Sequence, residues 1–234
     1  LTSKAVIIRN NKIIGSFILK SKPRPRDSAD AAFSGALEAA GLTIEDIDYC
    51  VGTGYGRDQM AFADAAVSEI SCHGKGAKWL LPSARTVIDI GGQDCKAIKL
   101  DADGHVERFN ANDKCASGTG RFLEVMAKIL GIDMNELGPL SRKARSPITL
   151  ASTCTVWAQA DVIKYLNSGT PIEDIGAGIN TAMAKRVAIL ANTVKPEGDV
   201  LMTGGVAKNM GVVATLEKLL GLRIKKARRA DPQM

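Results

Sequence analysis

A run of apolar residues that ends in an aspartate and two glycines is the first feature with chemical potential. Residues 87–94 read Val-Ile-Asp-Ile-Gly-Gly-Gln-Asp, which predicts a strand that fixes Asp89 near its end. Gly91 and Gly92 let the backbone approach a ligand closely, so that their N–H groups can face phosphate oxygens. Asp89 could then hold a Mg²⁺-bound water, and Gln93 could orient a water for attack on phosphorus. A plain β-turn is the alternative interpretation of this segment.

A second predicted strand runs into paired glycines near the other end of the chain. Met202 and Thr203 precede Gly204 and Gly205, and a helix is expected to follow. Such a turn can lie flat against an adenosine ring or present a helix N-terminus to phosphate. A tight strand-to-helix turn without a ligand is the simpler interpretation of this motif alone. Because two such glycine turns occur at opposite ends of one α/β chain, each nevertheless supports the ligand-binding interpretation of the other.

The first residues of the chain suggest a further contribution to phosphate binding. Thr2, Ser3 and Lys4 follow Leu1 and are expected in a turn between strands. Hydroxyl groups and an ammonium group in such a turn could form half of a phosphate clamp. Taken alone, this segment carries little information.

Two cysteines stand just before predicted helices. Cys115 lies in Lys-Cys-Ala-Ser-Gly-Thr-Gly, and Cys154 lies in Ser-Thr-Cys-Thr. A thiolate at a helix N-terminus is stabilised by the helix dipole and by free N–H groups. A 4Fe–4S cluster needs four thiolates as a rule, so two cysteines per chain predict a cluster shared across a two-fold axis. For either cysteine taken singly, inert packing is the simpler interpretation.

The remaining cysteines and the histidines predict no other metal centre. Cys50, Cys72 and Cys95 lie in apolar, helical or strand settings and are expected to pack. His73 has no second ligand pair at a spacing that would suit zinc. Five cysteines without tight spacing argue against a secreted disulfide framework and favour the reducing cytoplasm.

The composition is that of an ordinary globular chain, with 45% hydrophobic and 24% charged residues. Aromatic residues make up only 4%, which leaves few side chains to stack on bases and argues against nucleic-acid binding. The net charge of +6 suits an acidic partner at least as well. No apolar run of 18 residues indicates a membrane span.

The hydrophobic pattern predicts alternating strands and helices, and therefore a two-lobed α/β architecture. Expected strands cover residues 5–9, 13–20, 48–52, 86–90, 96–100, 106–110 and 199–202. The first expected helix has Ser28 or Asp30 as its cap, runs to Ala40 and stops at Gly41. Further expected helices cover residues 62–71, 74–81, 120–130, 135–144, 155–166, 171–194 and 210–220. The strands deliver both glycine turns toward one shared cleft.

Four segments together resemble the BadF/BadG/BcrA/BcrD ATPase family, which includes activators of 2-hydroxyacyl-CoA dehydratases and ATPase subunits of benzoyl-CoA reductase. They are residues 89–94, 112–123, 152–156 and 202–209. The stretch around Cys115 is long and specific, whereas the glycine turns are shared with the wider acetate kinase/Hsp70/actin superfamily. The resemblance extends over essentially the whole chain.

The resemblance implies an actin/Hsp70/acetate-kinase-like fold with two ribonuclease-H-like domains, residues 1–84 and 85–234, and ATP in the cleft. It implies that Cys115 and Cys154 ligate one 4Fe–4S cluster per homodimer. The first phosphate motif would end in residues 1–4, the second would hold Gly91, Gly92 and Gln93, and the adenosine motif would hold Gly204 and Gly205. Relative to the family pattern, an opening strand and a closing helix are missing, which suggests a fragment.

The implied activity is ATP hydrolysis coupled to electron transfer. A ferredoxin or flavodoxin would supply the electron, and a CoA-thioester dehydratase or reductase would receive it. Within the family, a benzoyl-CoA reductase subunit in a hetero-oligomer is the close alternative. Outside the family, the competing hypotheses are a cluster-free sugar or acyl kinase of the same superfold and a non-catalytic nucleotide-binding scaffold.

Overall fold

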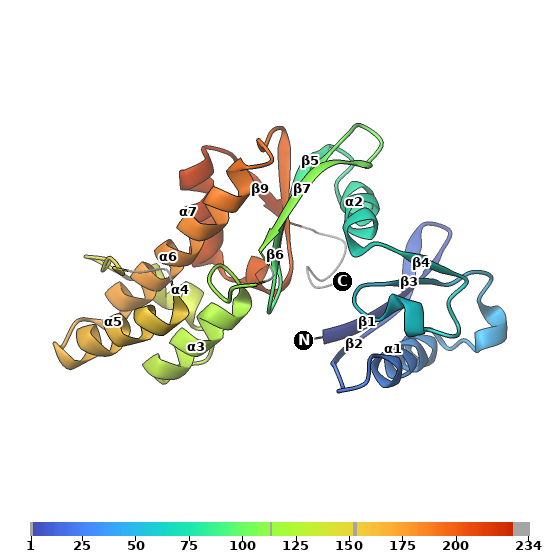
Figure 1. The fold of residues 1–234 in the computed structure, drawn as a ribbon, viewed down its shortest axis with the longest axis horizontal. Helices are drawn as coiled ribbons and strands as arrows, with labels where there is room; N and C mark the ends of the chain where they lie inside the picture. The colour runs from blue at the N-terminus through green and yellow to red at the C-terminus, as the bar shows by residue number, and fades with distance from the viewer. Residues whose placement is uncertain (1, 113, 152–153, 227–234) are drawn as a thin grey trace. The chain divides into compact units, whose positions relative to one another are not determined.

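The computed structural model describes residues 2–112, 114–151 and 154–226 (Figure 1). The chain divides into two compact units, one up to His73 and one from Gly74 onward. Each unit has its own sheets and helices, and each is described by itself below.

The first unit is built on an antiparallel hairpin. Strands β1 (Thr2–Arg9) and β2 (Lys12–Lys20) pair around Asn10 and Asn11, whose φ angles of 51° and 59° suit a two-residue turn. Helix α1 (Pro25–Ala40) packs on both strands, and a Cβ at Gly15 would stand only 2.6 Å from the Ala36 carbonyl oxygen. The glycine therefore permits the close approach of helix and strand.

Short elements complete this unit. The 3₁₀ turns η1 (Ile44–Asp46) and η2 (Arg57–Gln59) accompany a parallel pair, β3 (Val51–Thr53) and β4 (Ala65–Val67). The helix expected over residues 62–71 is wrong for most of its length, because β4 occupies its centre and pairs with β3; only residues 69–71 are helical, as the start of α2 (Glu69–Leu80). The ring of Phe33 stacks on that of Phe62 with centroids 4.7 Å apart, which joins α1 to this region.

The start of α1 also differs from the prediction. Ser28 and Asp30 are not caps, because the helix begins at Pro25 with Arg24 in the cap position. The Ser28 hydroxyl instead accepts a hydrogen bond from the Lys22 amide at 2.7 Å and so fastens the preceding loop. The predicted end is confirmed, since Gly41 closes the helix with a φ of 65°.

The second unit contains a five-stranded sheet in the order β7-β6-β5-β8-β9 (Figure 1). Strands β5 (Ala84–Ile90), β6 (Cys95–Leu100) and β7 (Val106–Asn112) form an antiparallel meander. Strand β8 (Asp199–Thr203) pairs in parallel with β5, and strand β9 (Ile224–Lys226) pairs in parallel with β8. The short strand β9 was not predicted, because three residues are too few to show a period.

Helices cover one face of this sheet. They are α3 (Gly120–Leu130), α4 (Leu137–Ser141), α5 (Thr155–Asn167), α6 (Ile172–Asn192) and α7 (Met210–Leu220), with the 3₁₀ turn η3 (Gly205–Lys208) after β8. The long helix α6 lies in the middle of the layer, and Ile175, Ile179 and Met183 are buried on it, as its period predicts. None of the described helices combines the length and apolar character needed to cross a bilayer.

The division between the units falls inside α2 (Glu69–Leu80), whereas the predicted domain boundary lies later, between residues 84 and 85. The second half of α2 belongs with the sheet, since a Cβ at Gly74 would stand 2.7 Å from the Gly104 carbonyl oxygen. Lys75 also donates a hydrogen bond to the Asp103 carbonyl at 3.1 Å. These contacts with the β6–β7 turn connect the helix to the second unit before β5 begins.

Candidate functional site

Asp89 lies near the carboxyl end of β5, beside the end of β8. The two strands are parallel, and their register places Thr203 directly beside Asp89. The Thr203 hydroxyl donates a hydrogen bond to Asp89 Oδ1 at 2.9 Å, and the aspartate is only 6% exposed. The carboxylate is thus held in a defined direction at the ends of the two strands.

The first glycine turn is closed by its own backbone. The Gly91 amide donates to the Asp94 carbonyl at 2.9 Å, and a Cβ at Gly91 would stand 2.5 Å from Asp94 Oδ1. The Asp94 side chain therefore lies against the turn, and it forms an ion pair with Lys96. Gln93 is exposed at the apex, where it has the freedom to meet a water or a ligand.

The second glycine turn packs on the end of β5. Gly204 adopts a φ of 81°, and a Cβ on it would overlap the backbone of Ile90. The two glycine motifs, far apart in the sequence, are therefore in direct backbone contact. Behind them Asn209 caps α7, since its Oδ1 accepts from the amides of Gly211 and Val212 at 3.0 and 3.2 Å.

Gly204→Ala is expected to lower the free energy of unfolding by about 2 kcal/mol or more, because strain at positive φ and the overlap with Ile90 add together. Urea unfolding measures the loss. Gly131→Ala is the matched control, because Gly131 has a similar φ of 69° but open space around it. Equal losses in the two variants would contradict the close contact between Gly204 and the backbone of Ile90 at the end of β5.

The first glycine turn is also bonded to helix α3. The Gly120 amide donates to the Gly91 carbonyl at 2.8 Å, and the Arg121 amide donates to the Gly92 carbonyl at 2.9 Å. A Cβ at Gly120 would stand 3.0 Å from the Gly91 oxygen, so this contact requires a small residue. Any shift of the turn would therefore act directly on the N-terminus of α3.

Cys115 lies in the loop between β7 and α3 and is exposed. The loop is held by Asn112, whose side-chain amide donates to the carbonyls of Cys115 and Ser117 at 3.1 and 2.7 Å. The expectation that Cys115 stands at the head of the helix is wrong in detail. Thr119 is the cap residue, and Gly118, with a φ of 82°, turns the chain between the cysteine and the helix.

Cys154 is itself the cap residue of α5 and is exposed, as the prediction of a thiol at a helix N-terminus requires. The preceding chain is held to the same helix, because the Ala151 amide donates to Asp161 Oδ2 at 2.9 Å. The hydroxyl of Thr155 is buried and has no hydrogen-bond partner in the described part of the chain. Ser152 and Thr153, part of the predicted motif, lie outside the described residues.

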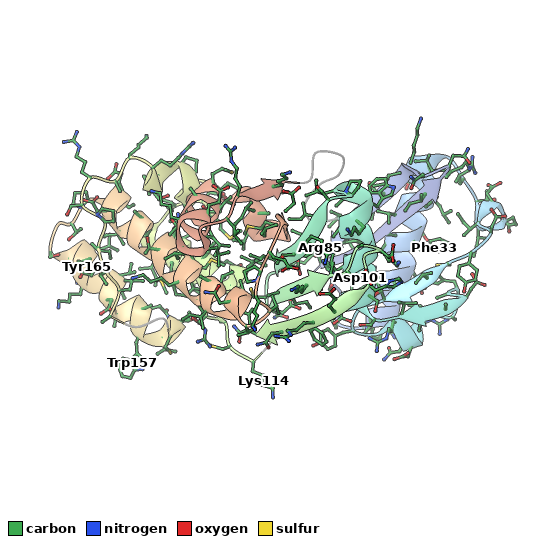
Figure 2. All side chains as sticks on the ribbon, turned by 90° about the horizontal axis from the view of Figure 1, so that it is seen from above. Phe33, Arg85, Asp101, Lys114, Trp157 and Tyr165 are labelled. Atoms are coloured by element: carbon green, nitrogen blue, oxygen red, sulfur yellow. The ribbon has the colours of Figure 1, made fainter. Side chains whose placement is uncertain are left out.

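The two cysteine segments come from neighbouring elements. Helices α3 and α5 pack against each other. Figure 2 shows Lys114, next to Cys115, and Trp157, in the first turn of α5, projecting from the same side of the second unit. Both thiols are thus accessible from the protein surface, and neither is sealed in the core.

Cys95 behaves differently from these two cysteines. It is 1% exposed and pairs with Ile90 across the sheet, on the face that the helices cover. Burial, with the nearby carboxylates of Asp89 and Asp94, raises the pKa of the Cys95 thiol. The predicted packing role of Cys95 is confirmed, and Cys50 and Cys72 are half-buried.

The residues proposed for the first phosphate motif lie in the other unit. Thr2, Ser3 and Lys4 belong to β1 rather than to a turn, so that part of the prediction is wrong. They pair with β2 as far as Lys20, and the hydroxyls of Ser3 and Ser21 are 2.9 Å apart. Leu1 lies outside the described residues. A role of this strand in phosphate binding stays a prediction.

Sequence reasoning missed Lys96, which is buried beside the site. Its signal was a lysine at an inward position of a predicted strand, which is rare unless the charge is paired.

A group that resembles a metal site, Asp101, Asp103 and His105, has a simpler explanation. Asp101 Oδ1 accepts from the amides of Asp103 and His105 at 2.9 and 2.8 Å, which is the geometry of an Asx turn.

A parallel pair of strand ends, with the Gly204 turn packed on the end of β5, belongs to an α/β fold of the actin/Hsp70/acetate-kinase class. A glucokinase structure of the ROK family from Streptomyces griseus shows the same fold class, with a TM-score of 0.56 at 13% identity over 97% of this chain and 91% of that one. The predicted fold class is therefore confirmed.

The sequence model described as the BadF/BadG/BcrA/BcrD ATPase family matches residues 1–233, so the chain belongs to this ATPase family. It is 44% identical over 226 residues to a 2-hydroxyisocaproyl-CoA dehydratase activator of Clostridioides difficile, covering 95% of this chain and 84% of the relative. It is 40% identical to a subunit of the benzoyl-CoA reductase of Thauera aromatica, covering 83% and 69%.

A solved structure resembles the whole chain. It is the activator of the 2-hydroxyisocaproyl-CoA dehydratase from Clostridium difficile with bound ADPNP, at a TM-score of 0.92 and 42% identity. The match covers 99% of this chain and 86% of that one. The predicted family membership is confirmed by these comparisons.

Proposed function

We propose that this protein is an ATP-dependent activator that transfers a low-potential electron from a 4Fe–4S cluster to a 2-hydroxyacyl-CoA dehydratase. The observation that carries the proposal is the pair of hydrogen bonds from Gly120 and Arg121 to Gly91 and Gly92. They join a phosphate-binding type of turn to the helix that follows Cys115. A protein of Clostridioides difficile that is 44% identical is named an activator of 2-hydroxyisocaproyl-CoA dehydratase, which supports the activator role.

In this proposal, residues of the strand ends bind and position the nucleotide. The Gly92 amide would face phosphate oxygens, while the Gly91 amide keeps the turn closed through its hydrogen bond to the Asp94 carbonyl and Gly91 lets the backbone approach the ligand. The Gly204–Gly205 turn would accept the adenosine. Asp89, aligned by Thr203, would hold water on Mg²⁺, and the exposed Gln93 would orient the attacking water. We also assign phosphate binding to Thr2, Ser3 and Lys4.

The two exposed thiols fit a cluster shared between two copies of the chain. Each chain would offer Cys115 and Cys154, so a homodimer would supply the four thiolates that a 4Fe–4S cluster needs. Bound there, the cluster would supply one low-potential electron. Cys154 at the N-terminus of α5 places its sulfur at the positive end of the helix dipole, and the buried Thr155 hydroxyl can donate to a sulfur acceptor.

The hydrogen bonds at Gly91 and Gly92 provide a route by which ATP could act on the cysteines. If the nucleotide moves this turn, α3 and the loop that holds Cys115 must respond. Withdrawing a positive helix end from the thiolates would make the site a stronger reductant. ATP can drive this change only if it binds the two arrangements with different affinity.

The electron donor and the cellular location are assigned from the same proposed role. A ferredoxin or flavodoxin would donate the electron, and the net charge of +6 suits an acidic partner. Five cysteines, an odd number without tight spacing, favour the reducing cytoplasm as the place of action.

A redox titration with and without a non-hydrolysable ATP analogue tests the proposal. We expect the analogue to lower the reduction potential by about 60 mV, a tenfold change for one electron. Inorganic phosphate in place of the analogue is the control and should leave the potential unchanged. An identical potential in all three conditions would contradict the coupling between nucleotide and cluster.

A component of a benzoyl-CoA reductase is the second candidate, favoured by the 40% identity to the Thauera aromatica protein. This role retains the chemistry but requires a hetero-oligomer. Native mass spectrometry of the anaerobically purified protein, alone and with its captured partner, distinguishes a homodimer from a mixed assembly. A cluster-free kinase would lack the broad absorbance at about 400 nm of an iron–sulfur protein.

A further inference from the structure

Lys96 is a buried charged group that the proposed function leaves without a role. It is 7% exposed on β6, directly opposite Asp89 on β5 in the antiparallel register. Residues opposite each other in such a pair point to the same side of the sheet, with Cβ atoms about 5 Å apart. The ammonium group therefore shares the second face of the sheet with the Asp89 carboxylate, away from the apolar helix layer.

The same ammonium forms an ion pair with Asp94 Oδ2. The other oxygen of Asp94 lies against Gly91, where a Cβ would stand 2.5 Å from Oδ1. The backbone of Asp94 accepts from the Gly91 amide at 2.9 Å. Lys96 thus holds the side chain that lies on the first glycine turn.

Asp89, Asp94 and Lys96 form a group of charged side chains on this face of the sheet. Asp89 and Asp94 contribute two negative charges and Lys96 one positive charge, while Thr203 adds only a neutral hydroxyl donor to Asp89. A buried lysine is retained as a rule only where it is paired. Without it, two carboxylates would stand beside a turn whose proposed ligand is a polyphosphate, and each added negative charge repels that ligand in a partly buried site.

We propose that Lys96 compensates the charge of the phosphate-binding turn: it holds Asp94 on the turn and offsets its carboxylate, so that polyphosphate binds before Mg²⁺ is present. The proposal rests on the nucleotide site proposed above. It makes Lys96 a positioning residue that acts through Asp94 and Asp89, and it explains why a charged side chain occupies an inward strand position.

Removing the ammonium group of Lys96 should change the binding affinities for ATP and for Mg²⁺ in opposite directions. Asp89, Asp94 and Lys96 together carry a net charge of −1, and the two carboxylates without Lys96 carry −2. The more negative group repels free ATP and attracts free Mg²⁺ more strongly. A role confined to packing would weaken both ligands alike or leave both unchanged. This difference in sign separates electrostatic compensation from a purely structural contribution.

The test compares the wild type with Lys96→Met, Lys96→Arg and the double variant Lys96→Met/Asp94→Asn. Calorimetry measures ATP binding in EDTA and, separately, Mg²⁺ binding without nucleotide; circular dichroism verifies the fold. We expect Lys96→Met to weaken ATP binding in EDTA by roughly tenfold and to strengthen Mg²⁺ binding. Lys96→Arg, which keeps the charge, and the double variant, which restores a net charge of −1, should recover ATP affinity in EDTA.

Two results would overturn the inference. One is a folded Lys96→Met variant that binds ATP in EDTA as the wild type does. The other is a double variant that binds ATP as weakly as Lys96→Met. The expected pattern together with a missing electron transfer to a dehydratase would count against the proposed activator function alone, because these measurements require neither cluster nor partner.

Discussion

Protein with Cys154→Ser, purified without oxygen, is expected to lose its 4Fe–4S cluster almost completely. Serine keeps the size of the side chain at the cap of α5 but replaces the thiolate that iron requires. Because a homodimer would lose two of four ligands at once, the remaining Cys115 pair could not hold the cluster. Iron content and absorbance at about 400 nm measure the loss. Cys115→Ser should have the same effect.

Cys72→Ala is the matched control for this experiment. Cys72 is a half-buried cysteine on α2 with no proposed ligand role, so its removal should leave iron content unchanged. A melting curve for each variant separates cluster loss from unfolding. If Cys154→Ser and Cys115→Ser kept their full iron content, the assignment of the two exposed thiols as ligands would be contradicted.

Asp89→Asn is expected to lower the rate of ATP hydrolysis by roughly 10²-fold, the usual effect of removing one group that stabilises a transition state. Asparagine keeps the oxygen that accepts from the Thr203 hydroxyl at 2.9 Å, so the strand ends should stay in place. The loss would come from the missing negative charge toward Mg²⁺. Phosphate release from the full chain under saturating ATP measures the rate.

Asp101→Asn provides the comparison, because Asp101 is an aspartate of the same sheet region that lies on the β6–β7 turn and serves an Asx turn. Its variant should hydrolyse ATP at the wild-type rate. Excess Mg²⁺ should restore part of the activity of Asp89→Asn if the carboxylate acts on the metal. Equal activity of Asp89→Asn and the wild type would remove Asp89 from the proposed site.

The hydrogen bonds between the Gly91–Gly92 turn and α3 give both experiments a common structural basis. The turn belongs to the proposed nucleotide site, and α3 follows the loop of Cys115. Gly120 makes the contact possible, because a Cβ there would stand 3.0 Å from the Gly91 oxygen. Gly120 therefore lets α3 pack on the glycine turn, and this contact also connects the proposed nucleotide site to the loop of Cys115.

Local sequence determined the elements whose signals are contained within a few residues. Helix α3 has the predicted bounds, Gly120–Leu130, because its amphipathic period ends at a glycine that closes the helix. Helix α7 likewise follows the predicted range, 210–220. The four motifs around Asp89, Cys115, Cys154 and Gly204 were sufficient to indicate the family, since they depend on residue types and order rather than on contacts.

Tertiary structure alone decided how distant residues meet. Residues 62–68 have an apolar content that suits a helix, but pairing with β3 makes Ala65–Val67 a strand. Lys96 became a member of the site only because strand register places it opposite Asp89. The bonds from α3 to the glycine turn join segments that no local pattern relates. The physical reason is that propensity and periodicity act over a few residues, whereas strand register and backbone contacts depend on the packing of the whole unit.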